Sequence, residues 1–176
     1  SVEALRPAMD RLTDLALSIG ARDVLLADTD ERKESIWNAR GAFLEAIKNS
    51  TTMMDECDVV VPRERIADFV RQSGQIGREA GVRICSFGHA GDGNLHIYVC
   101  KDAMEDQAWA KALEQVMDRL YAAARNLGGE VSGEHGIGHA KREFLRESLG
   151  ETQMALMRGI KSVFDPAGIL NPGKVL

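Results

Sequence analysis

The chain has 176 residues, of which 44% are hydrophobic and 28% are charged, and this composition is that of a soluble globular domain. Its 22 basic and 27 acidic residues give a net charge of −5 and offer no basic surface to a phosphate backbone, so nucleic acid is not an expected partner. The apolar runs are far shorter than the roughly 18 residues of a membrane-spanning helix, and no signal-peptide pattern opens the chain. We therefore expect a cytoplasmic protein in which Cys57, Cys85 and Cys100 are reduced core residues, since no C-x-x-C pair occurs.

Residues 1–55 are predicted to be mainly helical. Apolar residues recur at three- and four-residue steps from Val2 to Ile19, which is the period of an amphipathic helix. A short apolar run at 24–27 is consistent with a strand. Asp28 then stands where a second helix needs an N-cap.

The region from residue 57 to residue 132 predicts an α+β fold with a ferredoxin-like sheet. Strand and helix patterns follow one another in the order βαββαβ, which gives an antiparallel sheet with two helices on one face. The predicted strands are 57–61, 82–89, 94–100 and 130–132, and the predicted helices are 63–80 and 106–127. Two additional C-terminal helices, at about 138–148 and 151–163, precede a tail that is rich in proline and glycine.

A glycine-rich hairpin contains the first candidate for chemistry. Asp92-Gly93 between two apolar runs is typical of a two-residue type I′ turn, which would place His89 directly opposite His96 on one face of the sheet. Two imidazoles in that arrangement can share a metal ion. The alternative is a pair of structural histidines.

A second candidate lies at the end of the last predicted strand. Glu134 could complete a set of two histidines and one glutamate, which is the ligand set of a catalytic metal site with an open position. His135 beside it would be a free base, although both side chains could instead be solvated. The ligand types allow zinc, manganese or iron. Arg40 could bind a carboxylate and Lys174 an anion, or both could face solvent.

Three motifs resemble one family, the C-terminal domain of FAD-linked oxidases of the glycolate oxidase D-subunit, D-lactate dehydrogenase and D-2-hydroxyglutarate dehydrogenase type. They are the segments 88–96, 133–138 and 165–174, and the segments around Trp37-Arg40 and Asp58-Pro62 match as well. The resemblance implies that the chain is a fragment and that an N-terminal domain outside it binds most of the FAD. Residues 1–55 would be the remainder of a truncated first ferredoxin-like subdomain. Residues 56–134 would form the subdomain with the metal and substrate site, and 135–176 the C-terminal helices and a flavin-facing tail.

The resemblance also implies roles for individual residues. His89, His96 and Glu134 would hold zinc or manganese, His135 would be the catalytic base, and Arg40 would bind the substrate carboxylate. Asn171 and Asn94 would contact the cofactor. Some members have a substrate-binding lysine shortly before the Asp58 strand, where this chain has Asp55 and Glu56, and a dicarboxylate such as 2-hydroxyglutarate is therefore disfavoured.

The activity that the resemblance implies is oxidation of a small D-2-hydroxy acid, of the glycolate or D-lactate type, to a 2-oxo acid by hydride transfer to flavin. The electrons would pass to an electron-transfer flavoprotein, a quinone or a partner subunit. We also expect a homo-oligomer, located in the cytoplasm or at the inner face of the membrane, and no activity from this fragment alone. Two alternatives stay open: a metal-dependent hydrolase, and a non-catalytic module that docks a flavoprotein.

Overall fold

The computed structural model describes residues 2–176, which divide into a first unit ending at Ala46 and a second unit from Ile47 to Leu176. The first unit contains helices α1 (Val2–Ser18) and α2 (Asp30–Gly41), and helix α3 (Phe43–Lys48) crosses the boundary. The helix predicted near the start of the chain is confirmed by α1.

Two predictions in the first unit are wrong. Residues 24–27 are irregular and do not form a strand, because a strand needs a partner for its backbone groups and none of the residues described here pairs with this run. The N-cap of α2 is Thr29, whose side chain accepts a hydrogen bond from the Arg32 backbone N–H at 3.3 Å. Asp28 instead pairs with the Arg32 guanidinium at 2.7 Å.

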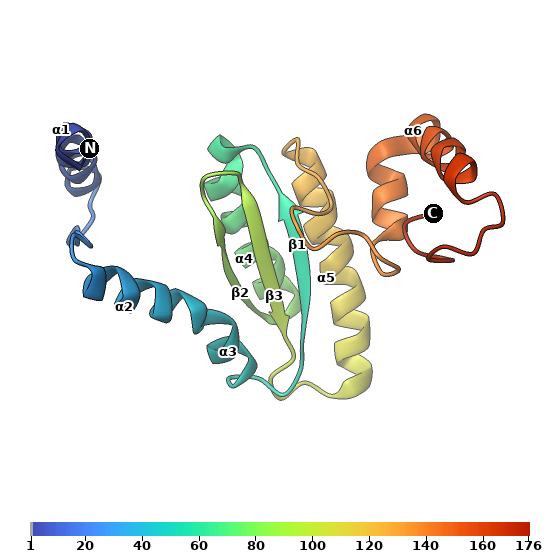
Figure 1. The fold of residues 1–176 in the computed structure, drawn as a ribbon. Coiled ribbons are helices and arrows are strands. Elements are labelled where there is room, and N and C mark those ends of the chain that lie inside the picture. Colours follow the sequence, from blue (N-terminus) through green and yellow to red (C-terminus); the bar gives the residue numbers. More distant parts are fainter. Residues whose placement is uncertain (1) are drawn as a thin grey trace. The chain divides into compact units, whose positions relative to one another are not determined.

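The second unit confirms the predicted order of three strands and two helices and then continues into a long interrupted helix (Figure 1). Its elements are β1 (Met54–Val60), a 3₁₀ turn (Arg63–Arg65), α4 (Ile66–Ala80), β2 (Arg83–His89), β3 (Asn94–Cys100), α5 (Asp106–Asn126) and α6 (Arg142–Phe164). Helix α6 is broken at Gly150, where φ is 73° and ψ is 171°, so its two halves correspond to the two predicted C-terminal helices. The first half begins at Arg142, later than predicted.

The sheet has three antiparallel strands in the order β1-β3-β2, and the predicted fourth strand at 130–132 is wrong. Only Glu130 bridges to β1, through two hydrogen bonds with Val60 at 2.8 and 3.2 Å. The chain does not continue as a strand after Glu130, because the hydrogen-bond donors that follow are directed at the Asp58 carboxylate and not at the backbone of β1. The Ser132 hydroxyl and the His135 backbone N–H both donate to the Asp58 carboxylate.

The core lies on one face of the sheet, which α4 and α5 cover together (Figure 1). Alternate residues of each strand point to that face, as the two-residue period of a strand requires. The central buried side chains are Val59, Ile97, Val99, Phe69, Val116 and Leu120. The first half of α6 joins this core through Phe144, whose ring lies 4.1 Å from that of Tyr121 on α5. The opposite face of the sheet carries charged and aromatic side chains, among them Phe87, whose ring stacks on that of Tyr98.

The β2–β3 hairpin has a different register from the predicted one. A four-residue connection, 90–93, joins the strands, and His96 lies opposite Phe87 while His89 lies opposite Asn94. A type I′ turn needs positive φ at both central residues, but only Gly93 has it, at 84°. The Asp92 carboxylate instead accepts a hydrogen bond from the Asn94 backbone N–H at 3.0 Å. His89 and His96 are therefore diagonal neighbours on the same face and not a directly opposed pair.

The three cysteines are all free, and Cys57 and Cys100 are buried as predicted, whereas Cys85 is only partly buried and lies opposite Tyr98, so it is not the core residue that was expected. Burial raises the pKa of the Cys57 thiol to about 12 and that of Cys100 to about 11, so both remain protonated. Within the part of the chain that the structure describes, no helix combines the length and the apolar character needed to cross a bilayer.

Candidate active site

The polar face of the sheet gathers charged and aromatic side chains from all three strands. β1 contributes Glu56 and Asp58, β3 contributes His96 and Tyr98, and β2 contributes His89. The register pairs Asp58 with His96 and Glu56 with Tyr98, so these side chains are cross-strand neighbours on one face. Two-residue alternation along each strand thus assembles the site opposite the apolar core.

His89, His96 and Glu134 converge as the sequence predicts. Their donor atoms all lie within 4.8 Å of one another, a spacing that can hold one metal ion. Glu134 Oε1 is 3.1 Å from His96 Nε2 and 3.6 Å from His89 Nε2. The His96 side chain is only 5% exposed, whereas those of His89 and Glu134 are 36% and 50% exposed. The set is therefore closed on the protein side and open toward solvent, as a site that admits a substrate must be.

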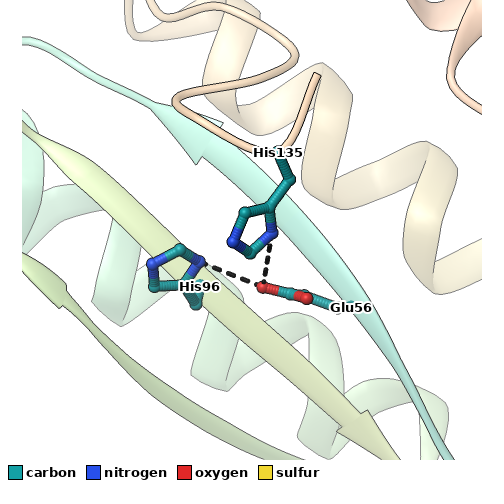
Figure 2. Close-up of side chains that lie close together, drawn as sticks. All are labelled: Glu56, His96 and His135. Atoms are coloured by element: carbon teal, nitrogen blue, oxygen red, sulfur yellow. Dashed lines mark hydrogen bonds and ion pairs between the residues drawn. The ribbon is translucent and has the colours of Figure 1, made fainter. Parts of the chain in front are cut away.

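His135 lies beside this set and is stacked on His96. The two ring centroids are 4.8 Å apart with an angle of 22° between the planes. His135 Nε2 lies 3.8 Å from Glu134 Oε1. The other ring nitrogen, Nδ1, lies 3.2 Å from Glu56 Oε1, a contact that Figure 2 shows. The side chain is 44% exposed, so one edge of the ring is accessible to a small molecule.

Asp58 holds the loop that carries Glu134 and His135, which we call the site loop. Its Oδ2 accepts hydrogen bonds from the Ser132 hydroxyl at 2.8 Å, the His135 N–H at 3.0 Å and the Glu134 N–H at 3.4 Å, and it pairs with the Lys141 ammonium at 3.3 Å. Burial tends to raise the pKa of Asp58, but these hydrogen bonds and the Lys141 charge outweigh burial and hold the pKa below its ordinary value. Asp58 is therefore a carboxylate that fixes the loop over the sheet.

Asn94 and Gly133 set how closely this loop approaches β3. A Cβ atom at Gly133 would lie 2.2 Å from the Asn94 Oδ1 atom, so only glycine fits there. Asn94 is buried, and its Oδ1 atom has no hydrogen-bond partner among the residues that the structure describes. Its predicted contact with the cofactor stays a prediction.

The remaining predicted residues belong to the first unit and to the C-terminal tail. Arg40 is on α2 in the first unit, with its guanidinium 5.5 Å from the centroid of the Trp37 ring. Asn171 lies in the exposed C-terminal tail with a φ of 46°, and its carbonyl accepts a hydrogen bond from the Lys174 N–H. The tail is tied to the segment after the site loop, because the Val175 N–H donates to the Gly138 carbonyl at 2.7 Å. The proposed roles of Arg40, Asn171 and Lys174 stay predictions.

Comparison with known proteins assigns the family. The chain matches the family "FAD linked oxidases, C-terminal domain" over residues 2–175. It belongs to this family. The match covers the hairpin, the site loop and the tail, the three segments on which the resemblance rested.

Among the curated relatives of this FAD-linked oxidase domain, a D-lactate dehydrogenase of Anaerostipes hadrus is 51% identical over 99% of the chain. A D-lactate dehydrogenase of Archaeoglobus fulgidus is 38% identical over 92% of the chain, and the glycolate oxidase subunit GlcD of Bacillus subtilis is 34% identical over 98%. The chain spans only 35–37% of the length of these relatives.

Sequence reasoning about this FAD-linked oxidase domain missed four residues of the site. Glu56 entered only as a departure from a lysine, Asp58 only as part of a matching segment, and Tyr98 and Lys141 not at all. One signal was available. Glu56 and Asp58 stand two residues apart in a strand, so they share a face, and two acidic side chains on a half-buried strand need partners.

Proposed function

We propose that this chain is the substrate domain of an FAD-dependent dehydrogenase that oxidises a small D-2-hydroxy acid, of the D-lactate or glycolate type, to a 2-oxo acid. The observation that carries the proposal is the convergence of two imidazoles and one carboxylate beside a third imidazole on the open face of the sheet. Relatives named D-lactate dehydrogenase and glycolate oxidase subunit support the same class of substrate.

The donor set fits a divalent metal, and we assign zinc or manganese to His89, His96 and Glu134. Imidazole nitrogen and carboxylate oxygen are ligands that both ions accept, and three protein ligands leave room for a substrate oxygen. Glu134 Oε1 lies 3.1 Å from His96 Nε2 and 3.6 Å from His89 Nε2, so these three atoms would be the ones to hold the ion. When bound, the metal supplies a Lewis acid that lowers the pKa of an alcohol group.

The residues of the chain then have distinct tasks. His135 receives the hydroxyl proton at Nε2, which lies at the rim of the donor set. Arg40 binds the substrate carboxylate and so fixes the direction of the α C–H bond. FAD, held by a domain outside this chain, supplies the hydride acceptor. The alcohol would lose its proton to His135, and the bound flavin would accept the hydride from the α-carbon, so the product would be the 2-oxo acid.

The charge of the site supports a substrate with one carboxylate. Glu56, Asp58 and Glu134 already place three carboxyl groups on the polar face. A second carboxylate on the substrate would be repelled by Glu56, which has two imidazoles but no lysine or arginine as its described partners. D-lactate and glycolate avoid this repulsion.

The proposal is tested by the metal content of the full-length protein that carries this chain, after reconstitution with zinc or with manganese. The parent protein is expected to hold about one equivalent and His96→Ala to lose it, because His96 is the buried ligand. His139→Ala is the matched control, since the His139 ring contacts the Gly173 carbonyl in the tail. Equal metal content in the parent and in His96→Ala would remove the ligand assignment, and failure of D-lactate and glycolate to reduce the flavin would remove the activity.

A further inference from the structure

One oxygen of Glu56 contacts three side chains at once. Its Oε1 atom lies 3.0 Å from His96 Nδ1, 3.2 Å from His135 Nδ1 and 3.1 Å from the Tyr98 hydroxyl. Figure 2 shows the two imidazoles directed at the same carboxylate from different elements, one on β3 and one on the site loop. The Glu56 side chain is 28% exposed, so the contacts are partly shielded from water.

These contacts determine which nitrogen of each ring carries a proton. An ionised carboxylate only accepts hydrogen bonds, so each Nδ1 atom must donate. Tyr98 donates as well, since burial and the nearby Glu56 charge raise the pKa of its hydroxyl. A neutral imidazole with hydrogen on Nδ1 has its lone pair on Nε2.

Both Nε2 atoms face the candidate metal site. His96 Nε2 lies 3.1 Å from Glu134 Oε1, and His135 Nε2 lies 3.8 Å from the same oxygen. The two rings are stacked at 4.8 Å, so one carboxylate can hold both in the same orientation. One lone pair is then available to bind a metal and the other to accept a proton.

We propose that Glu56 is a positioning residue that fixes the Nδ1–H tautomers of His96 and His135 together, and so turns one Nε2 atom into a ligand and the other into a base. The consequence for catalysis and the lone pair on His96 Nε2 rest on the proposed function, because Glu134 Oε1 lies 3.1 Å from that atom and requires a metal ion or a proton between them. The Nδ1–H contacts of the two rings with Glu56 do not rest on it. Glu56 is not one of the three proposed metal ligands, although Glu56, His96 and His135 also bring ligand atoms within 4.8 Å of one another.

The tautomers are read from the imidazole ¹⁵N shifts of the full-length protein with selectively labelled histidine, loaded with zinc. The parent is expected to show hydrogen on Nδ1 of both rings, and Glu56→Ala to lose this state in both. Glu56→Gln keeps the shape of the side chain but not its charge, and it is expected to weaken the preference. Asp106→Ala is the matched control, because the Asp106 side chain is 90% exposed and pairs with Lys101. Hydrogen on Nε2 of either ring in the parent, or unchanged shifts in Glu56→Ala, would overturn the proposal.

Zinc affinity and the rate of flavin reduction give a second test on the same variants. Loss of the group that accepts a hydrogen bond from the non-coordinating nitrogen of a metal-binding histidine typically lowers metal affinity roughly 10–100-fold. We expect the same decrease in zinc affinity for Glu56→Ala. The rate constant of flavin reduction by D-lactate should fall while the apparent substrate Kd changes little, and Glu56→Asp should restore part of both losses. Wild-type zinc affinity and reduction rate in Glu56→Ala would contradict the positioning role. Tautomers that shift in a protein with neither zinc binding nor D-lactate oxidation would retain that role and reject only the proposed function.

Discussion

The imidazoles of His96 and His135 stack at the site with their centroids 4.8 Å apart, and their neighbours give each a separate task. His96 is buried between Glu56 and Glu134, whereas His135 has one edge accessible to solvent. His139 follows four residues later but contacts the Gly173 carbonyl of the tail, 3.1 Å from its Nδ1. Exposure and partners therefore favour His135 as the base.

Replacement of His135 by alanine should lower the rate of flavin reduction by roughly 10²–10⁴-fold, which is the usual contribution of a positioned base. Zinc content should remain normal, because His89, His96 and Glu134 are unchanged. Stopped-flow reduction of the full-length protein with D-lactate, beside a metal assay, measures both quantities. His139→Ala is the control and should reduce its flavin at the parent rate. If His135→Ala did so instead, the base would be another residue.

At the scale of elements, the site loop lies against β3 through a glycine contact. A methyl group on Gly133 would overlap the Asn94 amide, which is buried and has little room to move. We expect Gly133→Ala to destabilise the protein by about 1–3 kcal/mol, the usual effect of overpacking. It should also weaken zinc binding, since Glu134 moves with the loop.

The control for this change is Gly91→Ala. A Cβ atom at Gly91 meets nothing within 4 Å, and its φ is not positive, so the substitution should leave stability nearly unchanged. Urea denaturation and zinc titration of both variants give the comparison. Equal behaviour of the two alanine variants would show that the loop is not held by this close approach.

The C-terminal tail is anchored by Asp165 after α6. The Asp165 carboxylate accepts hydrogen bonds from the Lys161 ammonium at 2.7 Å and from the Ile169 and Leu170 N–H groups at 2.9 and 3.0 Å. The Lys161 hydrogen bond, followed by those from the backbone, holds the pKa of Asp165 below its ordinary value. A lowered pKa stabilises the folded state above the pKa of the unfolded chain, and this contribution is lost as the pH falls through the folded pKa.

Asp165→Asn should therefore lower the urea midpoint at neutral pH, and the gap from the parent protein should close only below about pH 4, where the unfolded aspartate takes up its proton. Asp106→Asn is the control, because Asp106 pairs with Lys101 but its side chain is 90% exposed, so its loss should change little. A gap that stays constant down to pH 2.5 would contradict the role of the Asp165 charge.

At the scale of the whole molecule, the chain spans about 37% of its D-lactate dehydrogenase relative from Anaerostipes hadrus. We expect the isolated chain to bind no flavin and to oxidise no 2-hydroxy acid even with added FAD, because its sequence offers no loop that cradles phosphates. Absorbance spectroscopy of the purified chain after incubation with FAD and gel filtration is the measurement. Flavin that remains bound to the chain would contradict the expectation, whereas the same assay on a full-length relative gives the positive control.

The sequence alone determined three strands and two helices of the sheet unit, though not the absence of a fourth strand, and placed His89 and His96 on one face. Those features depend on local periods, in which residues two or four positions apart share a face. The motifs also indicated the family, which the match over residues 2–175 confirmed. The predicted hairpin register was wrong by two residues. It assumed a type I′ turn with positive φ at both Asp92 and Gly93, whereas only Gly93 has positive φ, and the dipeptide Asp-Gly by itself does not distinguish the two turns.

Only the tertiary structure showed Glu56 and Asp58 as parts of the site. The strand order β1-β3-β2 places β1 beside the histidine strand, although some forty residues separate Glu56 from His96 in the sequence. The site loop reaches the same place across 77 residues, through the hydrogen bond from the His135 N–H to Asp58. Periodicity fixes the direction of a side chain within its own element, but the partner of a charged group on that face depends on which strands become neighbours when the core closes.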